Sequence, residues 1–268
     1  MTSPILALEH IRITVTDLAT EIGHYAALLG VAPSWQGTAG DEEMAVFNTD
    51  NMSVHLVASE QARGLEAICF AVDNLERIHR RLKRVGIASH ETPEKTHSAT
   101  KITPKMHIAA SVDTRGIQLS FIERNASFGM TTSSAANGLD HIVIASQGAE
   151  GTAFLLGSQL GLDMRMDMSR AEWKARLMFF RCGDLIVEVF EQLGQDGAQT
   201  INDAASKQDS FYGLTWRVAD ADASHARLKQ AGFDVSEVRK GRKPGSRVLT
   251  VRNNTAGVAT LLIELPAA

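Results

Sequence analysis

The stretch "LEHIRIT" at residues 8–14 recurs, slightly altered, as "LDHIVIA" at residues 139–145. In both copies the apolar residues alternate with others, a period of two that predicts a β-strand. Each copy continues into a stretch that predicts a helix and ends in Leu-Gly, at residues 29–30 and 160–161. A strand followed by a helix therefore occurs in each half of the chain.

Two further matches extend this repeat through the chain. They pair "VFNTDNMSVHLV" (46–57) with "FFRCGDLIVEVF" (179–190), and "AICFAVDNLERIHRRLKRVGI" (67–87) with "GLTWRVADADASHARLKQAGF" (213–233). The first match is typical of strand, turn and strand, and the second of a strand followed by a helix. The sequence therefore predicts an α+β fold of four βαβββ modules.

The modules predict two domains. They fall at residues 5–58, 65–124, 138–192 and 211–266. Between the second and the third lies "NASFGMTTSSAAN" (125–137), whose small and polar residues predict a linker. We therefore expect an N-terminal domain at residues 1–124 and a C-terminal domain at residues 138–268.

The composition is that of a globular protein and excludes several functions. The 268 residues are 44% hydrophobic and 22% charged, and the net charge of −4 gives no overall attraction to nucleic acid or to an anionic membrane. No apolar run approaches the roughly 20 residues of a membrane span, and the N-terminus has no signal-peptide pattern. Two cysteines give no disulfide framework, so we expect the cytoplasm as the compartment.

The layout resembles the vicinal oxygen chelate superfamily, which includes glyoxalase I, the bleomycin-resistance proteins and the type I extradiol dioxygenases. The resemblance covers nearly the whole chain and is most specific at "LDHIVIA" and "WRVADADASHARLKQAGF". A chain of four modules is most similar to the extradiol dioxygenases. The resemblance implies that paired modules form a cup-shaped curved sheet, with the site on the concave face and the helices outside.

Alternation along the strands predicts which side chains face each cup. The inward residues of the first strands are His10 and Arg12 in module 1, His141 in module 3, and Thr215 and Arg217 in module 4. The last strands contribute His55 in module 1 and Glu188 in module 3. The repeated histidines are therefore expected to face the two cups.

The resemblance also implies where a metal would be held. Metal-binding superfamily members draw ligands from the first and last strands of a module, which here are His10, His55, His141 and Glu188. Such ligands suit Fe, Mn, Ni or Zn. The corresponding positions of modules 2 and 4 hold Ala67, Ser120, Gly213 and Leu261. Pairing of neighbouring modules leaves two ligands per cup, so a divalent metal stays an open question, and we expect no tight site in the C-terminal cup.

His141 and Glu188 also suit chemistry that needs no metal. An imidazole held by a carboxylate is an arrangement for general acid–base catalysis, and it also occurs as a purely structural pair. We expect these two residues to be the catalytic pair if the protein is an enzyme.

The segment "VRKGRKPGSRVLTVR" (238–252) concentrates positive charge in an acidic chain. Its arginines suit a carboxylate or phosphate, and the alternative is a solvated hairpin tip. We expect the ligand-binding residues of the C-terminal cup to be Arg217, Arg247, Thr215 and Arg242.

Three classes of function remain open from the sequence. The first is an isomerase, lyase or dioxygenase-like enzyme that acts on a small anionic oxygenated molecule in the C-terminal cup. The second is a non-catalytic binding protein of the bleomycin-resistance type, and the third is an interaction protein. We favour the enzyme, with a small molecule as partner and a homodimer left open.

Overall fold

The computed structural model describes residues 3–93, 104–108, 112–124, 135–194 and 208–266. Within these ranges the first half of the chain forms one eight-stranded sheet and two helices. Its elements are β1 (Ile5–Val15), α1 (Leu18–Leu29), β2 (Trp35–Ala39), β3 (Glu42–Asn48), β4 (Ser53–Ala58), β5 (Gly64–Val72), α2 (Leu75–Arg84), β6 (His90–Pro93), β7 (Pro104–Ile108) and β8 (Gln118–Glu123).

The described second half repeats this plan with a second eight-stranded sheet. Its elements are β9 (Ala136–Ser146), α3 (Ala149–Ala153), the π-helix η1 (Phe154–Leu160), β10 (Asp163–Arg170), the short 3-10 helix η2 (Ala171–Trp173), β11 (Ala175–Cys182), β12 (Leu185–Gln192), β13 (Ser210–Val218), α4 (Ala221–Gln230), β14 (Arg239–Lys240), β15 (Arg247–Val251) and β16 (Ala259–Glu264). The predicted α+β fold of βαβββ modules in two domains is confirmed.

Neighbouring modules pair with each other. The strand orders are β2-β3-β4-β1-β5-β8-β7-β6 and β10-β11-β12-β9-β13-β16-β15-β14. The first strands of two modules therefore lie side by side and antiparallel at the centre of each sheet, β1 with β5 and β9 with β13. The pairing separates His10 and His55 from His141 and Glu188, because each pair belongs to a different sheet.

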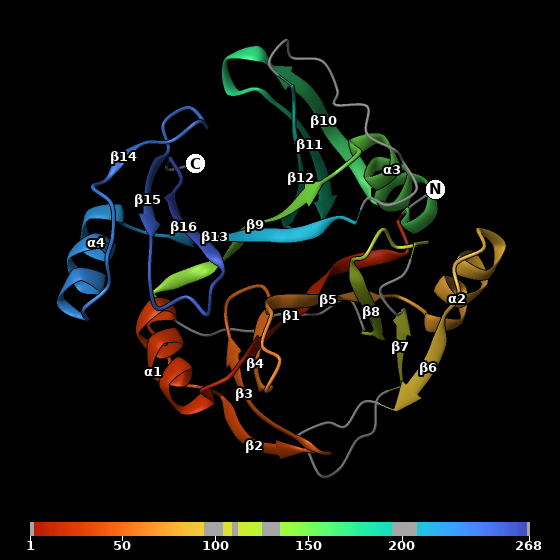
Figure 1. The fold of residues 1–268 in the computed structure, drawn as a ribbon, viewed down its shortest axis with the longest axis horizontal. Helices are drawn as coiled ribbons and strands as arrows, with labels where there is room; N and C mark the ends of the chain where they lie inside the picture. Colours follow the sequence, from red (N-terminus) through yellow and green to blue (C-terminus); the bar gives the residue numbers. More distant parts are fainter. Residues whose placement is uncertain (1–2, 94–103, 109–111, 125–134, 195–207, 267–268) are drawn as a thin grey trace.

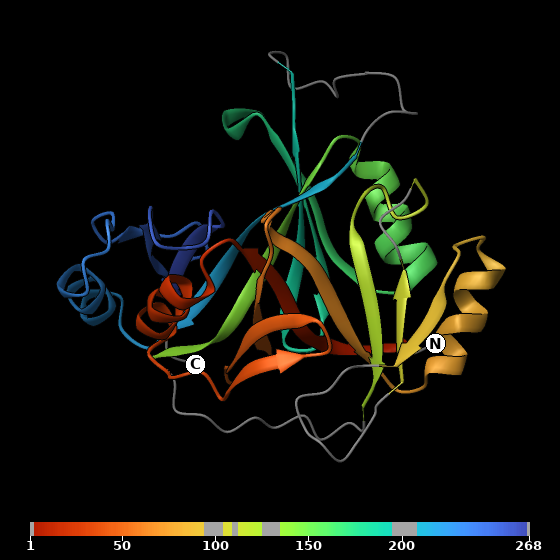
Figure 2. The same cartoon turned by 60° about the horizontal axis from the view of Figure 1, so that its bottom comes forward.

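The helices lie at the flanks of two bowed sheets (Figure 1). Both views place α1 beside α4 and α2 beside the helical segment of module 3 (Figures 1 and 2). Arg227 of α4 donates a hydrogen bond to the carbonyl oxygen of Leu28 at 3.0 Å, and Arg81 of α2 donates to that of Gln159 at 2.6 Å. The helices of one domain are thus tied to the other domain. No helix in the described ranges combines the length and apolarity that crossing a bilayer requires.

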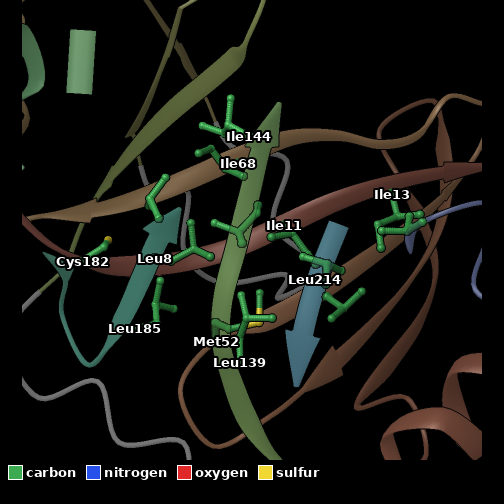
Figure 3. Packing of buried hydrophobic residues seen from close by; sticks show 14 of the residues in the cluster. Leu8, Ile11, Ile13, Met52, Ile68, Leu139, Ile144, Cys182, Leu185 and Leu214 are labelled. Carbon is green, nitrogen blue, oxygen red and sulfur yellow. The ribbon is translucent and has the colours of Figure 1, made fainter. Parts of the chain in front are cut away.

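One hydrophobic core joins the two sheets. Ile11 and Ile13 of β1 and Ile142 and Ile144 of β9 are all buried in a single cluster. Figure 3 shows side chains of crossing strands from both domains packed against one another. Because these residues alternate with the cup-facing set, their burial confirms the predicted faces of β1 and β9.

Local signals in the sequence account for the helix ends. Gly30 and Gly161 adopt the left-handed conformation, with φ of 71° and 89°, and end the helical segments as the Leu-Gly pairs predict. Of the predicted linker, residues 125–134 lie outside the described residues. Its last two residues already belong to β9, which begins at Ala136.

Candidate functional site

His141 is the centre of a polar cluster in the C-terminal cup. Its Nδ1 lies 2.9 Å from a carboxylate oxygen of Asp140. On the other side of the ring, Nε2 lies 2.8 Å from the Thr215 hydroxyl and 3.5 Å from a carboxylate oxygen of Glu188. The structure therefore brings together three residues that the sequence singled out, and adds Asp140 to them.

A β-bulge explains why Asp140 and His141 meet. In the pairing of β9 with β13, His141 lies opposite Thr215 but Leu139 lies opposite the very next residue, Trp216. Asp140 is therefore an extra residue in β9, and the bulge interrupts the alternation of faces. Strict alternation would send Asp140 away from the cup, so sequence reasoning missed it.

Burial sets the protonation of the carboxylates in this cluster. Burial raises the pKa of Glu188 above its usual value, and the nearby Asp140 carboxylate adds to this, while His141 and Arg242 oppose it. Burial also opposes ionisation of Asp140, but its hydrogen bonds with His141 and Arg217 lower the pKa. Asp140 is thus held as an anion, whereas Glu188 is a carboxyl group that takes up a proton more readily than usual.

Arg217 has a different role from the expected one. Its guanidinium lies 3.2 Å from Asp140 and 2.8 Å from Asp184, and donates to the backbone carbonyl of Asp184 at 2.6 Å. Two carboxylates therefore compensate its charge, so it is placed to hold Asp140 rather than an anionic ligand. The adjacent Asn51, from the N-terminal domain, donates to Asp184 at 3.0 Å and bonds both backbone groups of Leu139.

Arg247 does not reach the cup. Its guanidinium lies 2.7 Å from Asp222 of α4 and 3.4 Å from Glu264. Glu264 in turn accepts a hydrogen bond from the backbone N–H of Ala221, at the start of α4. The expectation that Arg247 and Arg217 converge on one ligand is therefore wrong, because Arg247 lies on the helix side of the sheet.

Arg242 of the basic segment contacts the hairpin of module 3. Its guanidinium carbon sits 4.3 Å from the ring centroid of Trp173, a cation–π contact between the basic hairpin of module 4 and the hairpin of module 3. Its positive charge lowers the pKa of Glu188, so the two groups lie within the range of an electrostatic interaction. Phe190, on the cup face of β12, lies 6.2 Å from the ring of Tyr212. Aromatic rings and one arginine thus flank the cluster around His141.

The N-terminal cup holds the equivalent pair. A bulge between Leu8 and His10 puts Glu9 beside His10, and the Glu9 carboxylate is hydrogen-bonded to His10 Nδ1. Arg124 donates to the other carboxylate oxygen at 2.9 Å. The ring of His55 stacks on that of His10, with centroids 4.0 Å apart. Glu9, like Asp140, was missed because alternation assigns it to the other face.

Ion pairing sets the charge state of Glu9. Its burial opposes ionisation, but His10 and Arg124 together hold the pKa well below the usual range. The repeated Leu-acid-His-Ile stretch is therefore a repeated acid–histidine pair, made by a bulge in each first strand.

The family follows from sequence comparison with known proteins. Two profiles described as the Glyoxalase/Bleomycin resistance protein/Dioxygenase superfamily match residues 7–107 and 140–250. The chain belongs to this superfamily. No curated protein matches the chain.

Solved structures of the superfamily share the fold of the whole chain. The Mn(II)-bound glyoxalase from Novosphingobium aromaticivorans has a TM-score of 0.73 at 14% identity, covering 98% of this chain and 83% of that one. The 2,3-dioxygenase LapB from Pseudomonas has a TM-score of 0.71 at 11% identity, covering 100% and 94%. The 2,2',3-trihydroxybiphenyl 1,2-dioxygenase from Sphingomonas wittichii has a TM-score of 0.68 at 16% identity, covering 97% and 91%. At these identities the likeness concerns the fold alone.

The two cups of this superfamily member differ in their metal-binding capacity. In the C-terminal cup His141, Glu188 and Asp140 do not bring three ligand atoms within 4.8 Å of one another, so a catalytic metal would have fewer ligands from the described residues than it usually has. In the N-terminal cup, ligand atoms of Glu9, His10 and Cys69 all lie within 4.8 Å of one another. The donor set for a metal therefore fits the N-terminal cup and does not fit the described part of the C-terminal one.

Proposed function

We propose that the C-terminal cup catalyses proton transfer on a small anionic oxygenated molecule, as an isomerase or lyase does, with Glu188 and His141 as the acid–base pair. The observation that carries this proposal is the 3.5 Å approach of His141 Nε2 to Glu188 in a half-buried cup. Superfamily membership supports the general class of enzyme.

Glu188 would act as the base. A carboxylate with a raised pKa, as at Glu188, is a stronger base than an ordinary glutamate. A substrate carbon next to a carbonyl group is the kind of site from which such a base removes a proton. Glu188 would take this proton from the substrate. His141 would accept it from Glu188 at Nε2 and return it to the substrate.

The partners of His141 would fix its orientation. Asp140 accepts the hydrogen bond from Nδ1, which leaves Nε2 directed at Glu188 and Thr215. Arg217 would act as a positioning residue, since it touches Asp140 and not the reacting atoms. The imidazole is thus held in one ring orientation while a proton moves at Nε2.

Arg242 would bind the anionic group of the substrate. It rests on Trp173 and lies close enough to Glu188 to influence its charge, so a carboxylate held there would lie near the acid–base pair. A planar guanidinium suits bidentate binding of a carboxylate.

The test is hydrogen exchange in heavy water. Small 2-oxo and 2-hydroxy carboxylates are incubated with the protein in D2O, and deuterium uptake at carbon is followed by proton NMR. We expect Glu188→Gln to slow exchange by about 10²–10⁴-fold, because it removes the base but keeps the shape. Arg242→Ala should raise KM more than it lowers kcat.

Two control variants make the result specific. Glu237→Gln removes an exposed glutamate of module 4, and Arg239→Ala removes an arginine of the same hairpin that bonds Ser236 and Thr250 instead. Both should exchange like the wild type. Ligands that raise the melting temperature but exchange no hydrogen would favour a binding protein of the resistance type. Exchange that survives Glu188→Gln would overturn the assignment of the base.

A further inference from the structure

We propose that the N-terminal cup contains a second site, which binds one divalent metal ion of the zinc class through Glu9, His10 and Cys69. The juxtaposition of these three residues carries the proposal, since one ligand atom of each lies within 4.8 Å of the other two. The site is independent of the acid–base pair in the C-terminal cup, which belongs to the other sheet.

The fold brings the three residues together through strand register. The bulge in β1 places Glu9 and His10 side by side, and the pairing of β1 with β5 puts Cys69 directly opposite His10. Ile68 and Phe70, the neighbours of Cys69, point into the main core, so Cys69 faces the cup. All three ligands come from the two central strands of the sheet, which its other strands flank on both sides.

This ligand set differs from the one that the superfamily pattern predicts. That pattern uses a first-strand and a last-strand residue of each module, which in this cup are His10, His55, Ala67 and Ser120. The ligands proposed here include only His10 of that set. Glu9 enters through the bulge and Cys69 through the facing strand.

The donor chemistry selects the metal. A thiolate, an imidazole and a carboxylate together suit Zn²⁺ and the similar Co²⁺, whereas sulfur disfavours Mg²⁺, Ca²⁺ and Mn²⁺. Three protein ligands also leave one position of a tetrahedral site for water or for an oxygen atom of a bound molecule.

The surroundings hold two of the ligands in place. Arg124 bonds one carboxylate oxygen of Glu9 at 2.9 Å, and the other oxygen, which is hydrogen-bonded to His10 Nδ1, would exchange that hydrogen bond for a monodentate bond to the ion. The His55 ring lies nearly parallel to that of His10, with an interplanar angle of 9°, and so fixes the orientation of that imidazole. Both residues are positioning residues for the metal.

The wall of the cup beside His55 is apolar. Val46 pairs with His55 across β3 and β4, and Val57 follows His55 by two residues on the same face. These two valines belong to a small hydrophobic cluster with Ala39, Met44 and Trp35, separate from the main core. Such a dry wall strengthens the attraction between the ion and its charged ligands.

The experiment is a titration of chelator-treated, full-length protein with Co²⁺, followed by absorption spectroscopy. We expect one equivalent to bind and to give a sulfur-to-cobalt charge-transfer band in the near ultraviolet. Cys69→Ser should abolish this band. Cys182→Ser is the matched control, because it removes the other buried cysteine, which lies in the C-terminal domain, and it should keep the band.

The remaining ligands are tested by affinity. His10→Ala and Glu9→Gln should each weaken Co²⁺ binding by at least about tenfold. Zn²⁺ should raise the melting temperature of the wild type and not that of Cys69→Ser.

The outcomes are distinct from those for the C-terminal cup. Failure of the wild type to bind Co²⁺ at one equivalent, or a charge-transfer band that persists in Cys69→Ser or disappears in Cys182→Ser, would overturn the proposal. If a variant does not fold, X-ray absorption of the Zn²⁺-loaded wild type decides the matter, since a site without sulfur contradicts it. Hydrogen exchange in the C-terminal cup is expected to be unchanged in Cys69→Ser, so either proposal can fail alone.

Discussion

The two cups carry the same acid–histidine pair in opposite surroundings. In the N-terminal cup the side chains of His10 and Glu9 are 5% and 6% exposed, and their neighbours are a second imidazole and a thiol. In the C-terminal cup His141 and Asp140 are 19% and 14% exposed, and their neighbours include Glu188 and Thr215. Both copies of the repeat contain the acid–histidine pair, and the residues around the pair decide what chemistry each copy can perform.

The charge states of the two cups differ in the same way. In the N-terminal cup burial opposes ionisation of Glu9, but its contacts with His10 and Arg124 lower its pKa. In the C-terminal cup the equivalent Asp140 also has a lowered pKa, but Glu188, at the position that His55 holds in the N-terminal cup, is buried nearby and has a raised pKa. Glu9 is thus a permanently charged element of structure, whereas Glu188 is suited to exchange a proton.

The largest expected difference between the cups is in stability. Glu9→Gln leaves Arg124 and His10 around a buried amide, and breaking a buried ion pair costs about 3–5 kcal/mol. Asp140→Asn should cost less, about 1–3 kcal/mol, because Arg217 keeps Asp184 as a partner. Urea unfolding at pH 7 with chelator present measures both without a contribution from metal.

Equal losses in the two variants would contradict this comparison. A good control is Glu237→Gln, which should unfold like the wild type because the residue is exposed on a loop. If Asp140→Asn proved the more damaging, the C-terminal pair would be the structural one and the assignment of roles would have to be exchanged.

The sequence predicted the arrangement of modules and most of the faces. The internal sequence repeats predicted the order of strands and helices. The alternation of apolar and polar residues along the strands predicted that the cup faces carry His10, His55, His141, Glu188 and Thr215. These predictions hold because both signals are local, and every copy of a module repeats them.

The parts that failed depend on contacts between distant residues. A single extra residue at Glu9 or at Asp140 shifts the face of the strand, and no composition signal marks such a bulge. Arg217 and Arg247 were expected to converge on one anionic ligand because both are cationic. Instead each forms an ion pair with a carboxylate of the protein, Arg217 with Asp184 and Arg247 with Asp222. The acid that precedes each repeated histidine was the one available clue to the bulge.

A smaller effect is expected where the two domains touch. The Asn51 amide bonds both the N–H and the carbonyl of Leu139 at 2.8 Å, directly before Asp140. Asn51→Ala leaves these buried backbone groups without that partner and should cost about 1–2 kcal/mol. We also expect slower proton transfer in the C-terminal cup, because the strand that positions His141 loses a support.

The matched control for this variant is Asn253→Ala. Asn253 also accepts a hydrogen bond from a backbone N–H, that of Asp234, at 2.8 Å, but in an exposed loop and from a residue of its own domain. It should lower stability less and leave exchange unchanged. An Asn51→Ala protein with normal exchange would show that the N-terminal domain has no influence on the acid–base pair.

The smallest expected effect, and the most direct comparison of the cups, is the pH dependence of stability. The lowered pKa of Glu9 means that its stabilisation is present above the usual glutamate pKa of 4.5 and is lost as the pH falls below it. The raised pKa of Glu188 has the opposite sign, because its stabilisation is complete below 4.5 and is lost as the pH rises through the raised value.

Melting curves of the wild type, Glu9→Gln and Glu188→Gln between pH 3 and pH 8 separate the two signs. The deficit of Glu9→Gln should shrink as the pH falls below 4.5, because the unfolded wild type then takes up a proton at this carboxylate whereas the folded wild type does not. Glu188→Gln should instead gain on the wild type as the pH rises, because it removes a carboxylate that is costly to ionise where it is buried. Parallel curves for Glu188→Gln and the wild type would mean that this carboxyl group titrates normally, and Glu188 would then lose the property that suits it to proton transfer.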